Sequence, residues 1–170
     1  ASTTGCFNVA IGSGPMAATD TTGNSNIAIG TYTGDALTTG TNNIGMGTHT
    51  LGATTTGLCN IAIGYYALKV ATTGCLNVAF GNLALGGADV TGSCNIAIGS
   101  GALQSVTSGY DNIALGALSS DAVNTGFNNV AIGNQTFSAA TTGCHNVAIG
   151  QAAMGGANTT ENHNIAMGTS

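Results

Sequence analysis

The sequence predicts an all-β protein built as a parallel β-solenoid (a β-roll), a rod of stacked coils. The chain repeats a variant of Thr-Thr-Gly-x-x-Asn-(Val/Ile)-Ala-(Ile/Met)-Gly ten times, and each Asn lies 17 or 18 positions after the previous one. So short and regular a period is typical of one supersecondary unit stacked on copies of itself. Apolar residues two apart in every copy indicate a strand. We count positions within a coil from this Asn, as position 0.

Two columns of large apolar residues define the expected strand and core. Position +1 is Val or Ile, and position +3 is Ile, Leu, Met or Phe. Because residues two apart lie on one strand face, we expect both columns to point inward. Position +8, mostly Leu, Met or Phe, indicates a second strand near +7 to +11. The predicted core residues are Val9, Ile11, Ile27, Ile29, Ile61, Ile63, Val78, Phe80, Ile96, Ile98, Ile113, Leu115, Val130, Ile132, Val147 and Ile149.

The opposite face of the same strand carries small residues of nearly constant size. Position +2 is Ala in every coil except one, where Gly45 replaces it. A solvated face usually varies and carries charges, whereas a stripe of methyl groups suits close packing against another surface. We therefore expect a self-association seam. Its residues are Ala10, Ala28, Ala62, Ala79, Ala97, Ala114, Ala131, Ala148 and Ala166.

The Asn at position 0 is expected to form a ladder of side-chain amides that caps the backbone at a corner of each coil. Gly at +4 is present in all ten coils, as expected at a turn that needs a positive φ or a close backbone approach. The ladder residues are Asn8, Asn26, Asn43, Asn60, Asn77, Asn95, Asn112, Asn129, Asn146 and Asn164.

Composition excludes several classes of partner. Lys69 is the single basic residue against six acidic ones, the net charge is −5, and charged residues are 4% of the chain. Nothing is available to neutralise phosphates, so neither nucleic acid nor an anionic membrane is an expected partner. No apolar run approaches the ~20 residues of a membrane span. No carboxylate pair, nucleophile–base arrangement or phosphate loop recurs, so we expect neither enzymatic activity nor a cofactor.

A longer unit overlies the coil repeat. Gly5-Cys6-Phe7-Asn8, Gly74-Cys75-Leu76-Asn77 and Gly143-Cys144-His145-Asn146 align when the sequence is shifted by 69 positions, which is four coils. Residues 1–170 are therefore expected to form a single solenoid repeat domain that is a segment of a longer array.

Five cysteines and three histidines are the residues most open to other chemistry. Cys6, Cys75 and Cys144 lie four coils apart, roughly 19 Å, and cannot pair with one another. Cys75 has neighbours in adjacent coils and can bridge either Cys59 or Cys94; free thiols are the alternative.

His145 and His163 occupy one column with Cys144 nearby. We expect two stacked histidines without metal, and a metal site formed by these three residues is the alternative.

The coils Asn8-Val9-Ala10-Ile11-Gly12, Asn129-Val130-Ala131-Ile132-Gly133 and Asn146-Val147-Ala148-Ile149-Gly150 resemble the repeat motif of trimeric autotransporter adhesin heads and of related phage tail-fibre segments. The resemblance covers all ten coils. It implies a left-handed β-roll whose chains associate side by side as a homotrimer and present an adhesive surface outside the cell.

Three functions therefore remain as hypotheses. The first is a structural and adhesive segment of an extracellular fibre or surface adhesin, self-associating side by side or end to end, located outside the cell or on a cell or virion surface. Its partners are other copies of the chain and a cell-surface or carbohydrate receptor. The second is an ice-binding solenoid that uses the Thr-Thr-Gly turns. The third is a carbohydrate-binding module that uses Tyr65, Tyr66, Tyr110 and Phe127.

Overall fold

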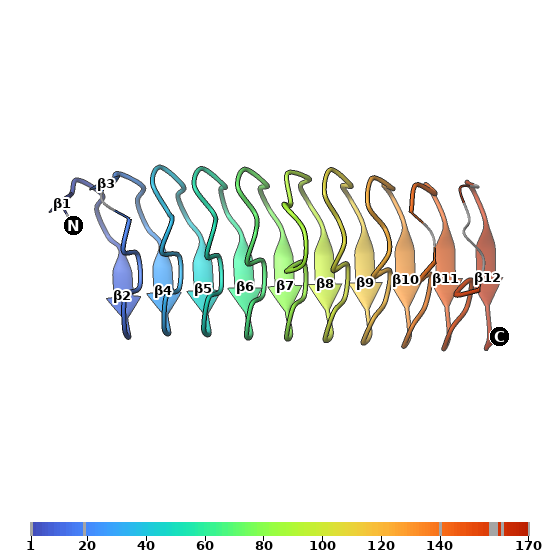
Figure 1. Cartoon of the computed structure of the whole chain (residues 1–170). Coiled ribbons are helices and arrows are strands. Elements are labelled where there is room, and N and C mark those ends of the chain that lie inside the picture. The colour runs from blue at the N-terminus through green and yellow to red at the C-terminus, as the bar shows by residue number, and fades with distance from the viewer. Residues whose placement is uncertain (1, 19, 140, 157–159, 161, 170) are drawn as a thin grey trace.

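The computed structural model describes residues 2–18, 20–139, 141–156, 160 and 162–169, and side chains at 2, 3 and 20 are left out of the description. It is an all-β solenoid of about nine turns (Figure 1). Ten parallel strands lie side by side in one sheet, in the order in which they occur along the chain. The described residues contain no helix. The predicted fold class is confirmed.

Each coil contributes one short strand, at positions +1 to +3. The strands are β2 (Val9–Ile11), β4 (Ile27–Ile29), β5 (Ile44–Met46), β6 (Ile61–Ile63), β7 (Val78–Phe80), β8 (Ile96–Ile98), β9 (Ile113–Leu115), β10 (Val130–Ile132), β11 (Val147–Ile149) and β12 (Ile165–Met167). A short parallel pair, β1 (Ser2–Thr3) with β3 (Asp20–Thr21), lies beside the first coils. Equivalent positions of neighbouring coils pair whether the coils are 17 residues apart, as for Val130 and Val147, or 18 residues apart, as for Val78 and Ile96. The sequence period therefore fixes the register.

The second strand expected near +7 to +11 is not formed in the described coils, where these residues make turns. The cause is the backbone conformation at +6 and +8. Tyr66 has φ 57° and Leu68 has φ 47°, in the left-handed region, which a strand cannot include. The coils still bond to one another here, since the Leu68 amide donates to the Ala84 carbonyl at 2.9 Å.

The core lies on the strand face opposite to the one expected. Ala62 and Ala97, at +2, are completely buried, whereas Phe80 and Ile98, at +3, are 52% and 43% exposed. The prediction that positions +1 and +3 form the core is therefore wrong. The residues that lie partly or largely exposed instead are Val9, Ile11, Ile27, Ile29, Ile61, Ile63, Val78, Phe80, Ile96, Ile98, Ile113, Leu115, Val130, Ile132, Val147 and Ile149.

The predicted self-association seam is wrong for the same reason, because the alanine column packs inside its own coils. Buried there are Ala28, Ala62, Ala79, Ala97, Ala114, Ala131 and Ala148. In the first and last coils Ala10 is exposed and Ala166 is partly exposed.

The narrow interior explains this inversion. A Cβ built on Gly45, the one glycine in the +2 column, would lie 2.8 Å from Thr33 Cγ2 and 3.1 Å from Leu51 Cδ1. The opposite wall, with small residues at +7 and large ones such as Leu51 and Leu68 at +8, already fills the space. A methyl group is therefore about the largest side chain that fits at +2, and a branched one would overpack the interior.

The constant glycines follow from close stacking of the coils. Gly99, at +4, has φ +135°, and a Cβ on it would lie 2.4 Å from the Gly116 carbonyl oxygen of the next coil. Gly57, in a Thr-Thr-Gly turn, would place a Cβ 2.6 Å from the Gly74 carbonyl oxygen. Glycine occupies +4 in all ten coils and the turn position in nine, with Glu161 in the last, because a side chain would collide with the backbone of the following coil.

Candidate functional site

The main surface feature is an outer strand face made of apolar side chains, nearly all of them aliphatic. We define it as the +1 and +3 residues of the ten strands β2 and β4 to β12. None of these side chains is buried, with Ile61 37%, Phe80 52% and Ile132 37% exposed. No charged residue occurs at these positions. Nine strand spacings of about 4.8 Å and a width of about 10 Å give roughly 400 Å², the size of the largest surface patches, which are often functional.

Apolar side chains just before the ladder Asn extend this face. Leu58 is 41% exposed at −2, and Leu76 is 56% exposed at −1. Tyr110, also at −2, is 42% exposed. The apolar surface therefore continues from the strands around the preceding corner in several coils.

The predicted asparagine ladder is confirmed, and it lies inside the coils. Asn112 is typical: its Oδ1 accepts from the backbone amide of Asn129 at 3.1 Å and from Asn129 Nδ2 at 3.0 Å. Its Nδ2 donates to the Gly126 carbonyl at 2.8 Å. Each backbone amide from Asn26 to Asn164 bonds to the preceding Asn Oδ1. The ladder is buried and presents nothing to a ligand.

A first stack of rings occupies position +6 in successive coils. Tyr32 and His49 stack with centroids 5.2 Å apart, and His49 and Tyr66 follow at 5.3 Å. The Lys69 ammonium lies 4.3 Å from the Tyr66 centroid, and the Tyr65 ring lies 4.0 Å from Tyr66. The centroid separations between rings of successive coils are close to the distance between neighbouring strands, so each ring packs its face against the ring of the next coil.

A second stack lies at the −2 and −1 corner. The rings of Tyr110 and Phe127 are stacked and nearly parallel, with centroids 4.8 Å apart. Phe127 then meets His145 edge-on, and His145 stacks on His163 at 4.9 Å. A sugar that stacks on an aromatic platform needs a free ring face. The two stacks cover such faces, so they give no support to an aromatic sugar platform.

Neither the candidate metal site nor the possible disulfide is formed among the described residues. No group of three or more His, Cys, Asp or Glu residues suited to a metal ion occurs in the described part of the chain. The Cys144 thiol donates instead to the Thr142 carbonyl at 3.3 Å. All five cysteines are free, so Cys75 bridges neither Cys59 nor Cys94.

The threonines of the Thr-Thr-Gly turns divide into two columns. The first hydroxyl bonds along the stack, as when Thr38 Oγ1 donates to the Thr55 carbonyl at 3.0 Å. The second residue faces solvent. Its column is Thr22, Thr39, Thr56, Thr73, Thr91, Ser108, Thr125 and Thr142. A single exposed row is a narrower hydroxyl surface than the flat Thr array that the ice-binding hypothesis requires.

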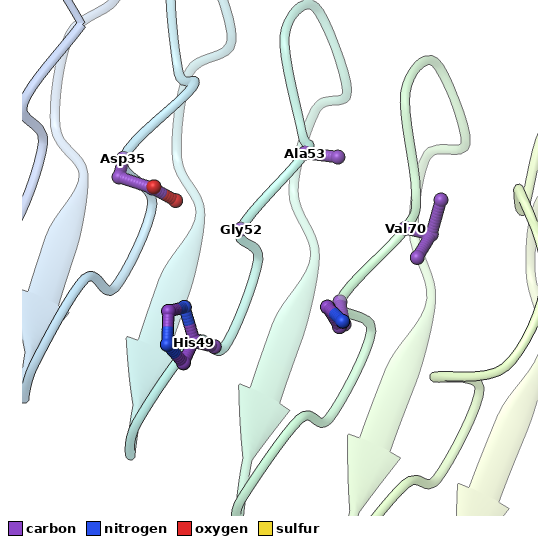
Figure 2. Close-up of a pocket in the computed structure, with 6 residues that line it drawn as sticks. Asp35, His49, Gly52, Ala53 and Val70 are labelled. Atoms are coloured by element: carbon purple, nitrogen blue, oxygen red, sulfur yellow. The ribbon is translucent and has the colours of Figure 1, made fainter.

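One hollow between neighbouring coils has two charged side chains and a histidine in its lining (Figure 2). Its volume is about 200 Å³, and it is lined by Asp35, His49, Gly52, Ala53, Lys69 and Val70. Asp35 Oδ1 is buried and has no hydrogen-bond partner. Sequence reasoning missed this site, although Asp35, Gly52 and Lys69 all fall at +9 in successive coils. Two further hollows, of about 390 and 190 Å³, lie at the first and last coils.

Comparisons with protein-family models, curated proteins and solved structures gave no match to this chain. Among the described residues, no helix is long and apolar enough to cross a membrane.

Proposed function

We propose that this chain is a structural and adhesive rod segment of an extracellular fibre or surface adhesin, and that it self-associates side by side through the outer strand face. It acts through its surface, without catalysis. The observation that carries the proposal is the unbroken apolar face along β2 and β4 to β12, with side chains such as Phe80 and Ile98 about half exposed.

The size of this face is sufficient for association. Complete burial of one Ile or Val is worth roughly 1.5–3 kcal/mol, so covering a side chain that is one-third to one-half exposed is worth roughly 0.5–1.5 kcal/mol. Two such residues on each of ten strands give roughly 10–30 kcal/mol. Association costs roughly 4–15 kcal/mol in lost freedom. The face can therefore hold two rods together, and shortening it to a few coils would abolish binding.

A second copy of the chain is the partner that matches this face best. The +1 and +3 side chains form ridges that repeat at every strand, about 4.8 Å apart. A partner surface whose ridges have a different spacing would fall out of register with these ridges within a few strands. An identical rod has the same spacing and stays in register over its full length. The absence of charge from these strand positions also means that two copies approach without burying an unpaired ion.

The remaining parts of the proposal rest on the Asn-Val-Ala-Ile-Gly resemblance. In adhesin heads of that pattern three chains associate outside the cell, and related coils occur in phage tail fibres, so we propose a homotrimer or larger fibre at a cell or virion surface. The exposed threonine column and the turns opposite the strand face then remain free for a cell-surface or carbohydrate receptor.

The test is the mass of the assembly after charging the outer strand face. The double variant Ile98→Lys/Ile132→Lys places two ammonium groups at partly exposed positions on β8 and β10. We expect sedimentation velocity to give the parent a multiple of 16.4 kDa and the double variant 16.4 kDa. Circular dichroism should show that the strand signal is retained, because both side chains can reach water.

The matched control is Thr56→Lys/Thr125→Lys, which makes the same charge change at exposed positions of the turn column. It should keep the parent mass. A parent that is monomeric at tens of micromolar, or a face variant with undiminished mass, would refute self-association through this face.

A further inference from the structure

At the hollow between Asp35 and Lys69 the repeat gives way to a cluster of unlike side chains. The only lysine, three of the four tyrosines and one of the three histidines lie in or beside it. In a rod that is 4% charged, such a gathering at one corner of three coils is a local departure from the repeat. Because the coil core does not need these residues, a binding role is the natural interpretation.

The charges are arranged on opposite sides of a gap. Asp35, Gly52 and Lys69 occupy position +9 in three successive coils, so the acidic and basic residues start two coil spacings apart, roughly 9–10 Å. Gly52 has no side chain to fill the space between them. Neither of the two charged groups has an ion-pair partner within the described residues. The gap is therefore open, with a carboxylate at one side and an ammonium group at the other.

Contacts with neighbouring rings position Lys69 and His49 at the hollow. Lys69 Nζ lies 4.3 Å from the Tyr66 ring centroid, a cation–π contact, and the His49 ring stacks between Tyr32 and Tyr66. Figure 2 shows Asp35 and His49 on the same side of the hollow, with Gly52 beside them. Asp35 Oδ1 is buried without a hydrogen-bond donor, which is costly for a carboxylate oxygen. A donor brought by a ligand would remove that cost.

We propose that this hollow binds a small solute with a carboxylate at one end and an ammonium or hydroxyl donor at the other. Lys69 pairs with the carboxylate, and Asp35 accepts from the donor. The volume of about 200 Å³ admits a single small molecule and no more. Free amino acids and acidic monosaccharides share this chemistry. The site goes beyond the proposed structural role and is independent of the outer strand face.

The test is a titration of the isotope-labelled chain, followed through the backbone amide signals of Gly52, Ala53 and Val70. Glycine and D-glucuronate carry both required groups, acetate carries only the carboxylate, and D-glucose carries only hydroxyls. We expect saturable shifts with glycine, which would indicate an amino-acid ligand, or with D-glucuronate, which would indicate an acidic sugar. Acetate and D-glucose should bind at least tenfold more weakly.

Four variants separate binding at this hollow from other effects. Asp35→Asn and Lys69→Gln should each weaken binding at least tenfold, and Asp111→Asn, an equal charge change at an exposed corner, should leave it unchanged. Gly52→Ala should also block the site, since its Cβ would sit 3.4 Å from Asp35 Oδ1 and 3.3 Å from the His49 carbonyl oxygen, a tight contact that shifts of a few tenths of an ångström relieve.

The proposal is overturned if neither glycine nor D-glucuronate saturates at tens of millimolar, if D-glucose or acetate binds equally well, or if Asp35→Asn binds like the parent. Each of these results leaves the assembly mass, and hence the proposed function, untouched.

Discussion

Replacing Asn112 by alanine tests what holds neighbouring coils together. Asn112 is 1% exposed and lies in the middle of the ladder. Its Nδ2 donates to Asn95 Oδ1 at 3.1 Å and to the Gly126 carbonyl at 2.8 Å. Its Oδ1 accepts from the amide nitrogen and Nδ2 of Asn129. Alanine removes all four hydrogen bonds. The Asn129 amide and the Gly126 carbonyl then lose their ladder partner in a buried place.

The expected loss of stability follows from the four hydrogen bonds that the substitution removes. Four hydrogen bonds at about 1 kcal/mol each give a loss of about 4 kcal/mol in the free energy of unfolding. For a chain of this length, 1 kcal/mol lowers the melting temperature by about 2–4 °C. The Asn112→Ala chain should therefore melt about 8–16 °C below the parent.

The control is Asn134→Ala, which makes the same chemical change at an exposed position. Asn134 Nδ2 makes one hydrogen bond, to the Ala117 carbonyl at 3.2 Å. Because water replaces that partner, its loss should lower the melting temperature by no more than about 4 °C. Both variants are melted by circular dichroism at one protein concentration, since self-association makes the melting temperature concentration-dependent. Equal melting temperatures for the two variants would refute the view that the ladder binds the coils together.

Two further predictions use the strand phase and a buried carboxylate. Ala131→Asp should place an unpaired charge in the filled interior and unfold the neighbouring coils. Ile132→Asp, one residue away on the outer face, should leave the circular dichroism spectrum intact. If Ile132→Asp unfolded the coils and Ala131→Asp did not, the +1 and +3 residues would be the inner face after all. Burial raises the pKa of the Asp121 carboxyl, whose Oδ1 has no hydrogen-bond partner. A raised pKa in the folded state means that the protonated form is favoured there, so the carboxylate destabilises the fold above that pKa and ceases to do so as the pH falls below the unfolded value. Asp121→Asn should therefore raise the melting temperature at pH 7, with a gain that shrinks toward pH 3, and a gain independent of pH would contradict this cause.

The sequence by itself determined the fold class, the position of the strand at +1 to +3 and the register. A short, nearly constant period with Asn at position 0 leaves little choice but in-register parallel stacking, and the ladder from Asn8 to Asn164 follows directly. These features are local or periodic, so the chain itself records them.

Only the tertiary structure decided which strand face is inside. Period-two alternation defines two faces, and hydrophobicity identifies the inner one only when the other is polar. Here both faces are apolar, and space is the deciding factor: Leu51 and Thr33 fill the interior opposite Gly45, so the small +2 residues pack inside and the large +1 and +3 residues remain outside. The constant small size of the residues at +2 was the sequence signal that this face lies inside.

The hollow at Asp35 likewise depends on tertiary structure. Residues one repeat apart become neighbours only when the coils stack, and Gly52 opens the space between Asp35 and Lys69, which lie two repeats apart in the sequence. The stacking that makes the fold predictable is therefore also what brings these unlike residues together.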